Sequence, residues 1–203
     1  MCVGSVIKSS AMADLEWINR LLRKDNAITQ KLVLSESMKL GGFFAKLISF
    51  SCDSWYWMVA LLAIWLFGRE PWRERAFLLA LAIGFLAVGV LSIKYLVRRQ
   101  RPEGEWGRVY RALDPHSFPS GHAARALCIA LLVCFFGLGW AGFGLLVWAA
   151  LVGWSRISLR LHFLVDVVAG WLIGAIAAGV TIMFYPVLQV LHGWILNIIA
   201  KVI

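Results

Sequence analysis

The chain has 203 residues, of which 61% are hydrophobic and 15% are charged, and 20 Lys and Arg face 11 Asp and Glu. This length fits one domain, and a mean hydropathy of +0.79 excludes a soluble globular protein, which could not bury so much apolar surface. The formal net charge of +9 suits anionic lipid surfaces or phosphorylated substrates. Nucleic acid is disfavoured as a partner because no soluble module with a basic face is recognisable.

The first 52 residues are predicted to lie at the membrane surface. A helix is expected from Asp14, with Asp14 as its N-cap and the apolar Leu15, Ile18, Leu21 and Leu22 on one face. A basic amphipathic helix of this kind lies in the interface plane, whereas the alternative is a solvent-facing helix packed on its own domain. Residues 36–52 are apolar, but Lys39 and Lys46 make a complete crossing costly, so this part is predicted to be interfacial or re-entrant.

Residues 53–203 are predicted to form a bundle of transmembrane helices. Apolar runs lie at about 53–68, 76–93, 121–137, 143–154 and 162–185, and an apolar tail follows Pro186. The tail is either a lipid-hugging helix or a short last span. The expected fold is therefore an all-α integral membrane protein with five to six transmembrane helices behind the N-terminal interfacial segment.

Polar residues gather at one end of this expected bundle. Successive spans alternate in direction, so the end of the second span, the start of the third, the end of the fourth and the start of the fifth share one membrane face. Ionisable residues at a membrane boundary are costly and indicate a functional site. Those expected to converge are Lys94, Arg101, His122, Arg156, His162 and Asp166.

His162 and Asp166 form the core of this predicted site. They are four residues apart at the start of an apolar run, so on a helix they would share one face. The carboxylate could hold one imidazole nitrogen and leave the other free as a nucleophile. Arg156, at the end of the preceding apolar run, could meet an anion there.

Two further segments add cations and donors. Lys94 and Arg101 are seven residues apart, which is two helical turns, so they can point the same way, although a basic collar at a helix end would look similar. Ser120 and Gly121 are predicted to open a helix, where free backbone N–H groups and the helix dipole favour an anion. His122 in that first turn could protonate a leaving oxygen. Arg125 is either a substrate contact or part of a structural ion pair.

These groups together predict phosphoryl transfer through a phosphohistidine. The cations neutralise the phosphate, the backbone donors hold it, and the two histidines act as nucleophile and acid. No metal or other cofactor is expected, because the sequence shows no cluster of Asp and Glu and no Cys or His ligand spacing among its four cysteines.

The motifs resemble the three-part signature of the type 2 phosphatidic acid phosphatase (PAP2) family, which shares its site with vanadium haloperoxidases. They are Lys94-x6-Arg101-Pro102, Pro119-Ser120-Gly121-His122, and Ser155-Arg156-x5-His162-x3-Asp166. The resemblance implies a membrane helical bundle that dephosphorylates lipid phosphates or diphosphates without a metal. It implies His162 as nucleophile, Asp166 as its orienting group and His122 as acid. The phosphate would be held by Lys94, Arg101, Ser120, Gly121 and Arg156.

Alternatives stay open at this stage. The same intermediate would serve a lipid phosphotransferase, and a non-catalytic protein could bind lipid phosphates with the cations alone. A haloperoxidase is disfavoured because that chemistry belongs to soluble relatives. The short chain resembles prokaryotic members, so the membrane of a prokaryotic cell is expected. The resemblance implies an active site on the extracytoplasmic face. With five spans, however, the distribution of Lys and Arg places the site in the cytoplasm. If residues 36–52 also cross the membrane, the two predictions agree.

Overall fold

The protein is all-helical in its computed structural model, which describes residues 3–34, 38–103, 112 and 114–202. In this part of the chain the extended pairing is limited to an isolated bridge between Gln100 and His116. The helices are α1 (Val3–Leu32), α2 (Lys39–Ser51), α3 (Ser54–Phe67), α4 (Trp72–Val97), α6 (Gly121–Phe135), α7 (Gly139–Ser158), α8 (Leu164–Met183) and α9 (Tyr185–Val202).

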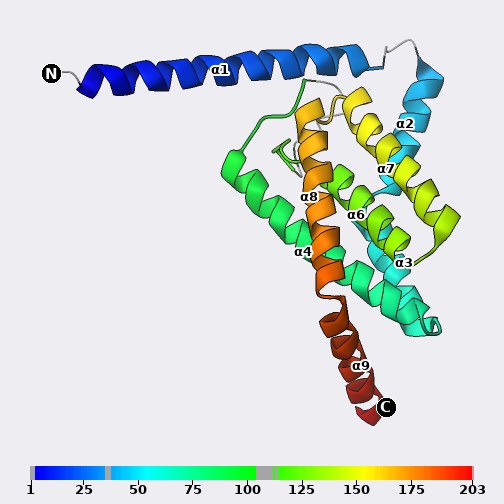
Figure 1. Cartoon of the computed structure of the whole chain (residues 1–203). Helices are drawn as coiled ribbons and strands as arrows, with labels where there is room; N and C mark the ends of the chain where they lie inside the picture. The colour runs from blue at the N-terminus through cyan, green and yellow to red at the C-terminus, as the bar shows by residue number, and fades with distance from the viewer. Residues whose placement is uncertain (1–2, 35–37, 104–111, 113, 203) are drawn as a thin grey trace.

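Helix α6 is the centre of the bundle and packs against α4, α7 and α8 (Figure 1). Its contact with α8 is close because α8 presents Gly170 and Gly174, four residues apart, on the facing side. A Cβ atom at Gly170 would stand 2.5 Å from the carbonyl oxygen of Ser120, and one at Gly174 would stand 2.2 Å from that of Ala124. Small residues at this spacing let two membrane helices approach backbone to backbone. The start of α6 is thereby held beside the start of α8.

The expected count of five to six membrane spans is not confirmed. Among the described residues, three helices are long and apolar enough to cross a membrane, namely α4, α7 and α8, and α2 with α3 would make a fourth as a pair bent by 46°. Helix α6 is apolar but has only 15 residues, about 22 Å at 1.5 Å per residue against roughly 30 Å of hydrocarbon. As the innermost helix, it is wrapped by its neighbours rather than by lipid along most of its length, so its core role does not require a full span.

The boundaries of several elements also differ from the expectation. The predicted N-cap at Asp14 is wrong, because α1 begins at Val3 and continues through Asp14 as one helix to Leu32. Residues 39–67 form two helices joined at Cys52 and Asp53, which is where the predicted interfacial or re-entrant segment meets the predicted span. The placement of α2 in the membrane stays a prediction. Helix α8 ends before Pro186, and the tail forms α9, in which Pro186 occupies the first turn, where its missing N–H costs nothing.

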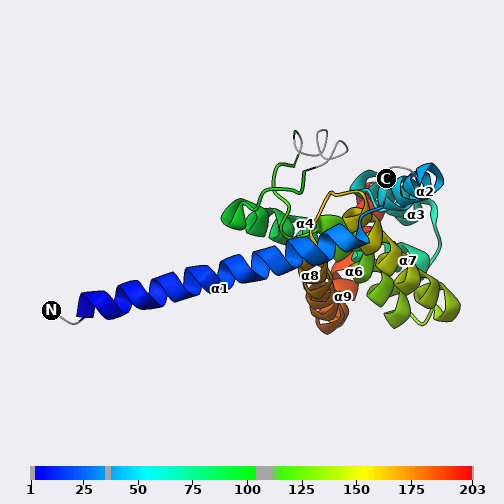
Figure 2. The same ribbon diagram turned by 90° about the horizontal axis from the view of Figure 1, so that it is seen from above.

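Helix α1 crosses one end of the bundle at a steep angle to α4 and α8, and α9 lies at the opposite end (Figure 1). Seen from above, the first part of α1 extends well beyond the bundle, while its last turns pass over the start of α8 (Figure 2). A hydrogen bond confirms this second contact, because the backbone N–H of Leu164 donates to Thr29 Oγ1 at 3.1 Å. Just beyond α1, the backbone N–H of Leu34 donates to the carbonyl of Ser158 at the end of α7, at 3.3 Å.

Candidate active site

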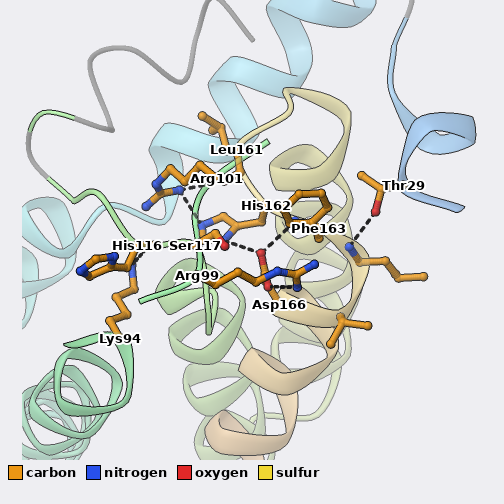
Figure 3. Close-up of polar contacts among 12 residues, drawn as sticks. Thr29, Lys94, Arg99, Arg101, His116, Ser117, Leu161, His162, Phe163 and Asp166 are labelled. Atoms are coloured by element: carbon orange, nitrogen blue, oxygen red, sulfur yellow. Dashed lines mark hydrogen bonds and ion pairs between the residues drawn. The ribbon is translucent and has the colours of Figure 1, made fainter. Parts of the chain in front are cut away.

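His162 lies in the loop between α7 and α8, close to Arg101 and Asp166 (Figure 3). Because α8 begins only at Leu164, the predicted reason for its nearness to Asp166, a shared helical face, is wrong. Asp166 instead sits in the first turn of α8 and accepts the backbone N–H of Phe163 at 2.9 Å. The turn still brings His162 Nδ1 to 3.7 Å from Asp166 Oδ2, an ion-pair distance longer than a direct hydrogen bond.

The other imidazole nitrogen of His162 faces a cation. Its Nε2 atom is 3.2 Å from a terminal guanidinium nitrogen of Arg101. A guanidinium only donates hydrogen bonds, so Nε2 is the acceptor and the ring proton of the neutral form belongs on Nδ1, toward Asp166. Burial, followed by the positive charges of Arg101, Arg156 and Lys94, holds the pKa of His162 well below its ordinary value. The ring is therefore neutral near pH 7, with the lone pair of Nε2 directed at the cations.

Lys94 and Arg101 meet at a carboxylate that the sequence analysis did not include. Helix α4 ends at Val97, and Arg98 follows with a left-handed φ of 52°, so the expected two-turn spacing does not apply to Arg101. Both cations nonetheless reach Asp114 Oδ2: Lys94 Nζ bonds to it directly, and Arg101 donates to it at 2.8 Å. Arg101 also donates to the carbonyl of Leu161 at 2.8 Å, which fixes the guanidinium beside the His162 loop.

Arg156 lies in the last turn of α7 and is 1% exposed. One of its terminal nitrogens donates to the hydroxyl of Ser49 on α2 at 2.5 Å. A buried guanidinium needs polar partners to offset the loss of its hydration. The bent pair of α2 and α3 thus takes part in holding the predicted phosphate-binding residues.

The start of α6 lies directly against the start of α8. The backbone N–H of Ser120 donates to the carbonyl of Asp166 at 2.9 Å, so this N–H is engaged, while the buried Ser120 hydroxyl makes no hydrogen bond within the described residues. His122 is the second residue of α6, and its Nε2 atom lies 2.7 Å from Oδ1 of Asp53. Asp53 lies at the junction of α2 and α3. Each predicted catalytic histidine therefore lies next to a different carboxylate, Asp53 for His122 and Asp166 for His162.

A cavity of about 230 Å³ joins these groups. Five of the predicted site residues line it: Lys94, Gly121, His122, Arg125 and His162. Arg125 lies one turn deeper than His122 and bonds to the hydroxyl of Ser54, which lines the same cavity. Asp114 also lines the cavity, and the rest of the wall is apolar and belongs to α4, with Ile83, Leu86, Ala87, Val90 and Leu91. The same cavity is therefore lined both by charged side chains and by apolar side chains.

Several residues of this site escaped the sequence analysis. Asp53 and Asp114 lie outside the three motifs, and Arg99 lies at an unspecified position inside the first one, so no motif spacing singled them out. Arg99 bonds to Asp166 Oδ1 at 2.6 Å and so fixes the carboxylate next to His162. The pair of glycines at 170 and 174 did carry a readable signal, since small residues four apart in an apolar helix indicate a close helix contact.

Comparison with known proteins identifies the family. The model of the PAP2 superfamily matches residues 73–189, which contain all three motifs. The chain belongs to the PAP2 superfamily. It is similar to the undecaprenyl-diphosphatase BcrC of Bacillus subtilis, at 35% identity over 127 residues, covering 59% of this chain and 62% of that protein. It is also similar to the putative undecaprenyl-diphosphatase YbjG of Escherichia coli, at 29% identity over 70% of this chain and 79% of that protein.

Solved PAP2 structures share the fold. The structure of LpxE from Aquifex aeolicus matches with a TM-score of 0.64 and 26% identity, covering 77% of this chain and 93% of that one. A PAP2-type phosphatidylglycerolphosphate phosphatase from Bacillus subtilis matches with a TM-score of 0.67 and 25% identity, covering 83% and 87%. The PAP2 membrane-protein fold thus extends over most of this chain. The region matched by the family model, however, excludes α1, α2 and α3.

Proposed function

We propose that this PAP2 protein hydrolyses a lipid phosphate or diphosphate through a phosphohistidine on His162. The observation that carries the proposal is the setting of His162: a buried, neutral imidazole with Arg101 at one nitrogen, Asp166 near the other, and His122 across the same cavity. A scaffold that only bound lipid phosphates would need the cations but neither histidine. The proposal therefore favours catalysis over binding.

In the first step, Nε2 of His162 attacks the phosphorus and forms a P–N bond. The bond from phosphorus to the leaving oxygen breaks, and His122 gives that oxygen its proton. Burial and the surrounding cations oppose protonation of His122. The negative charges of Asp53, 2.7 Å from His122 Nε2, and of the bound phosphate would offset them and favour the protonated form. Asp166 stabilises the positive charge that develops on His162.

In the second step, water replaces the leaving group. His122, now neutral, takes a proton from this water, whose oxygen attacks phosphorus and breaks the P–N bond. Inorganic phosphate leaves, and His162 returns to its neutral state. The reaction consumes one water and neither gains nor loses electrons, so it needs no redox partner.

Charge stabilisation in both steps is assigned to Lys94, Arg101 and Arg156. Three cations around one phosphoryl group neutralise the negative charge that spreads over its equatorial oxygens in the transition state. The hydroxyl of Ser120 and the backbone at Gly121 would add hydrogen bonds from the start of α6. Arg125 is proposed as a contact to the leaving-group side of the substrate, since it lines the cavity one turn beyond His122.

The apolar wall of α4 suits the hydrocarbon part of a lipid substrate. A chain lying against Leu86, Val90 and Leu91 would place its phosphate next to Lys94, at the end of the same helix face. The names of the relatives point to two substrate classes, isoprenyl diphosphates and phospholipid or lipid A phosphates. We propose that the substrate comes from one of these classes.

The test is phosphate release by the purified protein in detergent with a chelator present. The panel contains phosphatidic acid, phosphatidylglycerol phosphate, and isoprenyl mono- and diphosphates, each measured beside His162→Ala. We expect release from one class and its loss in the variant. Labelled substrate quenched within one turnover should leave acid-labile label on the wild-type protein and none on His162→Ala.

Two results would contradict this proposal. Activity retained in His162→Ala would remove the assigned nucleophile. Release that appears only when a second lipid is added would indicate a phosphotransferase that uses the same intermediate.

A further inference from the structure

The last turns of α1 place two polar side chains in a buried position at the start of α8. Asp25 is 6% exposed and Thr29 is 1% exposed, whereas their neighbours on α1 are mostly exposed. Burying a carboxylate costs several kcal/mol unless it is paired and hydrogen-bonded. A helix that served only as a surface anchor would not need these two groups at this point.

Both side chains bond to α8 as caps of its first turn. The backbone N–H of Leu164 donates to Thr29 Oγ1 at 3.1 Å (Figure 3). The backbone N–H of Val165 donates to Asp25 Oδ1 at 3.1 Å. The first N–H groups of a helix have no partner within it, so side-chain oxygens there stabilise the helix start. In this protein these oxygens come from a helix more than 130 residues earlier in the chain.

Arg99 links the same carboxylate to the catalytic one. One terminal nitrogen of Arg99 is 2.6 Å from Asp25 Oδ2, and the other is 2.6 Å from Asp166 Oδ1. The guanidinium also lies over the ring of Phe163, 4.1 Å from its centroid. A planar guanidinium held by two carboxylates and a ring has little freedom to turn. Asp25 thereby fixes the group that fixes Asp166.

We infer that Asp25 and Arg99 are positioning residues for the nucleophile, and that α1 is a working part of the active site. Asp25 holds Arg99, Arg99 holds Asp166, and Asp166 holds His162 with its Nε2 toward the phosphate. This inference rests on the proposed function. It extends the site beyond residues 73–189, since Asp25 lies in α1, outside the region that the family model matches.

The experiment compares Asp25→Asn, Arg99→Gln and the double variant in detergent, with kcat and KM measured on the active substrate class. Asn retains an oxygen for the N–H of Val165 and removes only the charge that holds Arg99. We expect kcat to fall about 10- to 100-fold in each single variant, by analogy with the loss seen when the outer partners of metal-ligating histidines are removed, with KM changed less than about twofold. The double variant should be no slower than Arg99→Gln alone, because both changes break one chain of contacts.

The matched control is Glu16→Gln, which removes an acidic residue from the same helix. Glu16 pairs with Arg20 at 3.7 Å, and both side chains are exposed, so its loss should leave kcat unchanged. Melting temperature and elution volume show whether each variant is folded. Asp25→Glu keeps the charge and gives a second reading: its kcat should exceed that of Asp25→Asn.

Three results are decisive. If folded Asp25→Asn and Arg99→Gln turn over as fast as Glu16→Gln, the inference is wrong and the proposed function stands. If the two losses multiply in the double variant, the residues do not act through one another and the inference is also wrong. If the wild type is inactive, or His162→Ala is active, the proposed function fails and the inference with it.

Discussion

Asp114 changes how the phosphate-binding cations should be viewed. Its carboxylate accepts from both Lys94 and Arg101, so an anion already occupies the place proposed for the substrate phosphate. The side chain of Asp114 is 36% exposed, far more than those of the two cations. A phosphate entering the cavity must therefore compete with Asp114, and the carboxylate can turn toward solvent when displaced.

We expect Asp114→Asn to bind inorganic phosphate more tightly. Removing the competing charge should lower the inhibition constant of phosphate about tenfold, or roughly 1.4 kcal/mol, near the value of one hydrogen bond to a charged group. Competitive inhibition measured at fixed pH gives this constant. Glu103→Gln, an exposed acid in the same loop, is the control and should leave it unchanged. Weaker inhibition of the Asp114 variant would show that the carboxylate helps to hold the phosphate.

His162 leads to a prediction about pH. Burial and the nearby cations oppose its protonation, so its pKa lies well below its ordinary value of about 6.5. The neutral, nucleophilic form should persist as pH falls through 6.5 and be lost only at lower pH. With four histidines in the chain, NMR of histidine-labelled protein can follow each ring. The signal that is absent in His162→Gln should titrate below pH 6.5, and a midpoint at or above 6.5 would contradict the assigned environment.

Among the helices, the contact between α6 and α8 is the one that assembles the proposed active site. It sets Ser120 against Asp166 and so brings the second motif to the third. The approach depends on the missing side chains at Gly170 and Gly174, where any Cβ would meet backbone rather than a movable side chain. The apolar pattern of α8 alone would have tolerated larger residues.

We expect Gly174→Leu to destabilise the bundle and abolish most activity. A large side chain forced into a packed contact costs about 1–3 kcal/mol, and here the opposing group is the carbonyl of Ala124. Gly179→Leu is the matched control, because a Cβ at Gly179 meets nothing within 4 Å. The melting temperature in detergent should fall for the first variant and stay near wild type for the second. Equal melting temperatures would show that the helices can separate without loss.

At the scale of the whole molecule, α1 lies across the active-site end of the bundle rather than along it (Figures 1 and 2). Its exposed apolar residues include Trp17, Leu21 and Leu22. An amphipathic helix in this position is suited to the boundary between headgroups and lipid chains. The membrane-surface placement of α1 stays a prediction.

We expect Trp17 to lie at headgroup depth. A polarity-sensitive dye at Trp17→Cys, in a chain whose native cysteines are replaced, should report an environment between water and hydrocarbon in lipid nanodiscs. Phe85, an exposed residue in the middle of α4, is the matched position and should report hydrocarbon. An emission at Trp17 equal to that in water would place α1 in solvent, clear of the membrane.

The membrane class and the family follow from the amino-acid sequence alone, and the sequence also predicts the chemistry of the site. Three motifs carry residue types that few other functions require together, and apolar runs long enough for membrane helices follow from hydropathy alone. Alternating directions of these runs also predicted which ends would meet. Several of the local reasons were nevertheless wrong, since Arg101 and His162 lie in loops rather than on helices.

Only the tertiary structure decided which groups support the motifs. Asp25, Asp53 and Asp114 reach the site from segments far apart in the chain, and their pairing depends on how α1, α2 and the loop after α4 fold over the bundle. Isolated charges carry no periodicity, so no local pattern shows their partners. Packing also decided which helix forms the core, because α6 is short but is surrounded by its neighbours. Burial and proximity are properties of the folded chain, and they depend on contacts that spacing along the sequence does not encode.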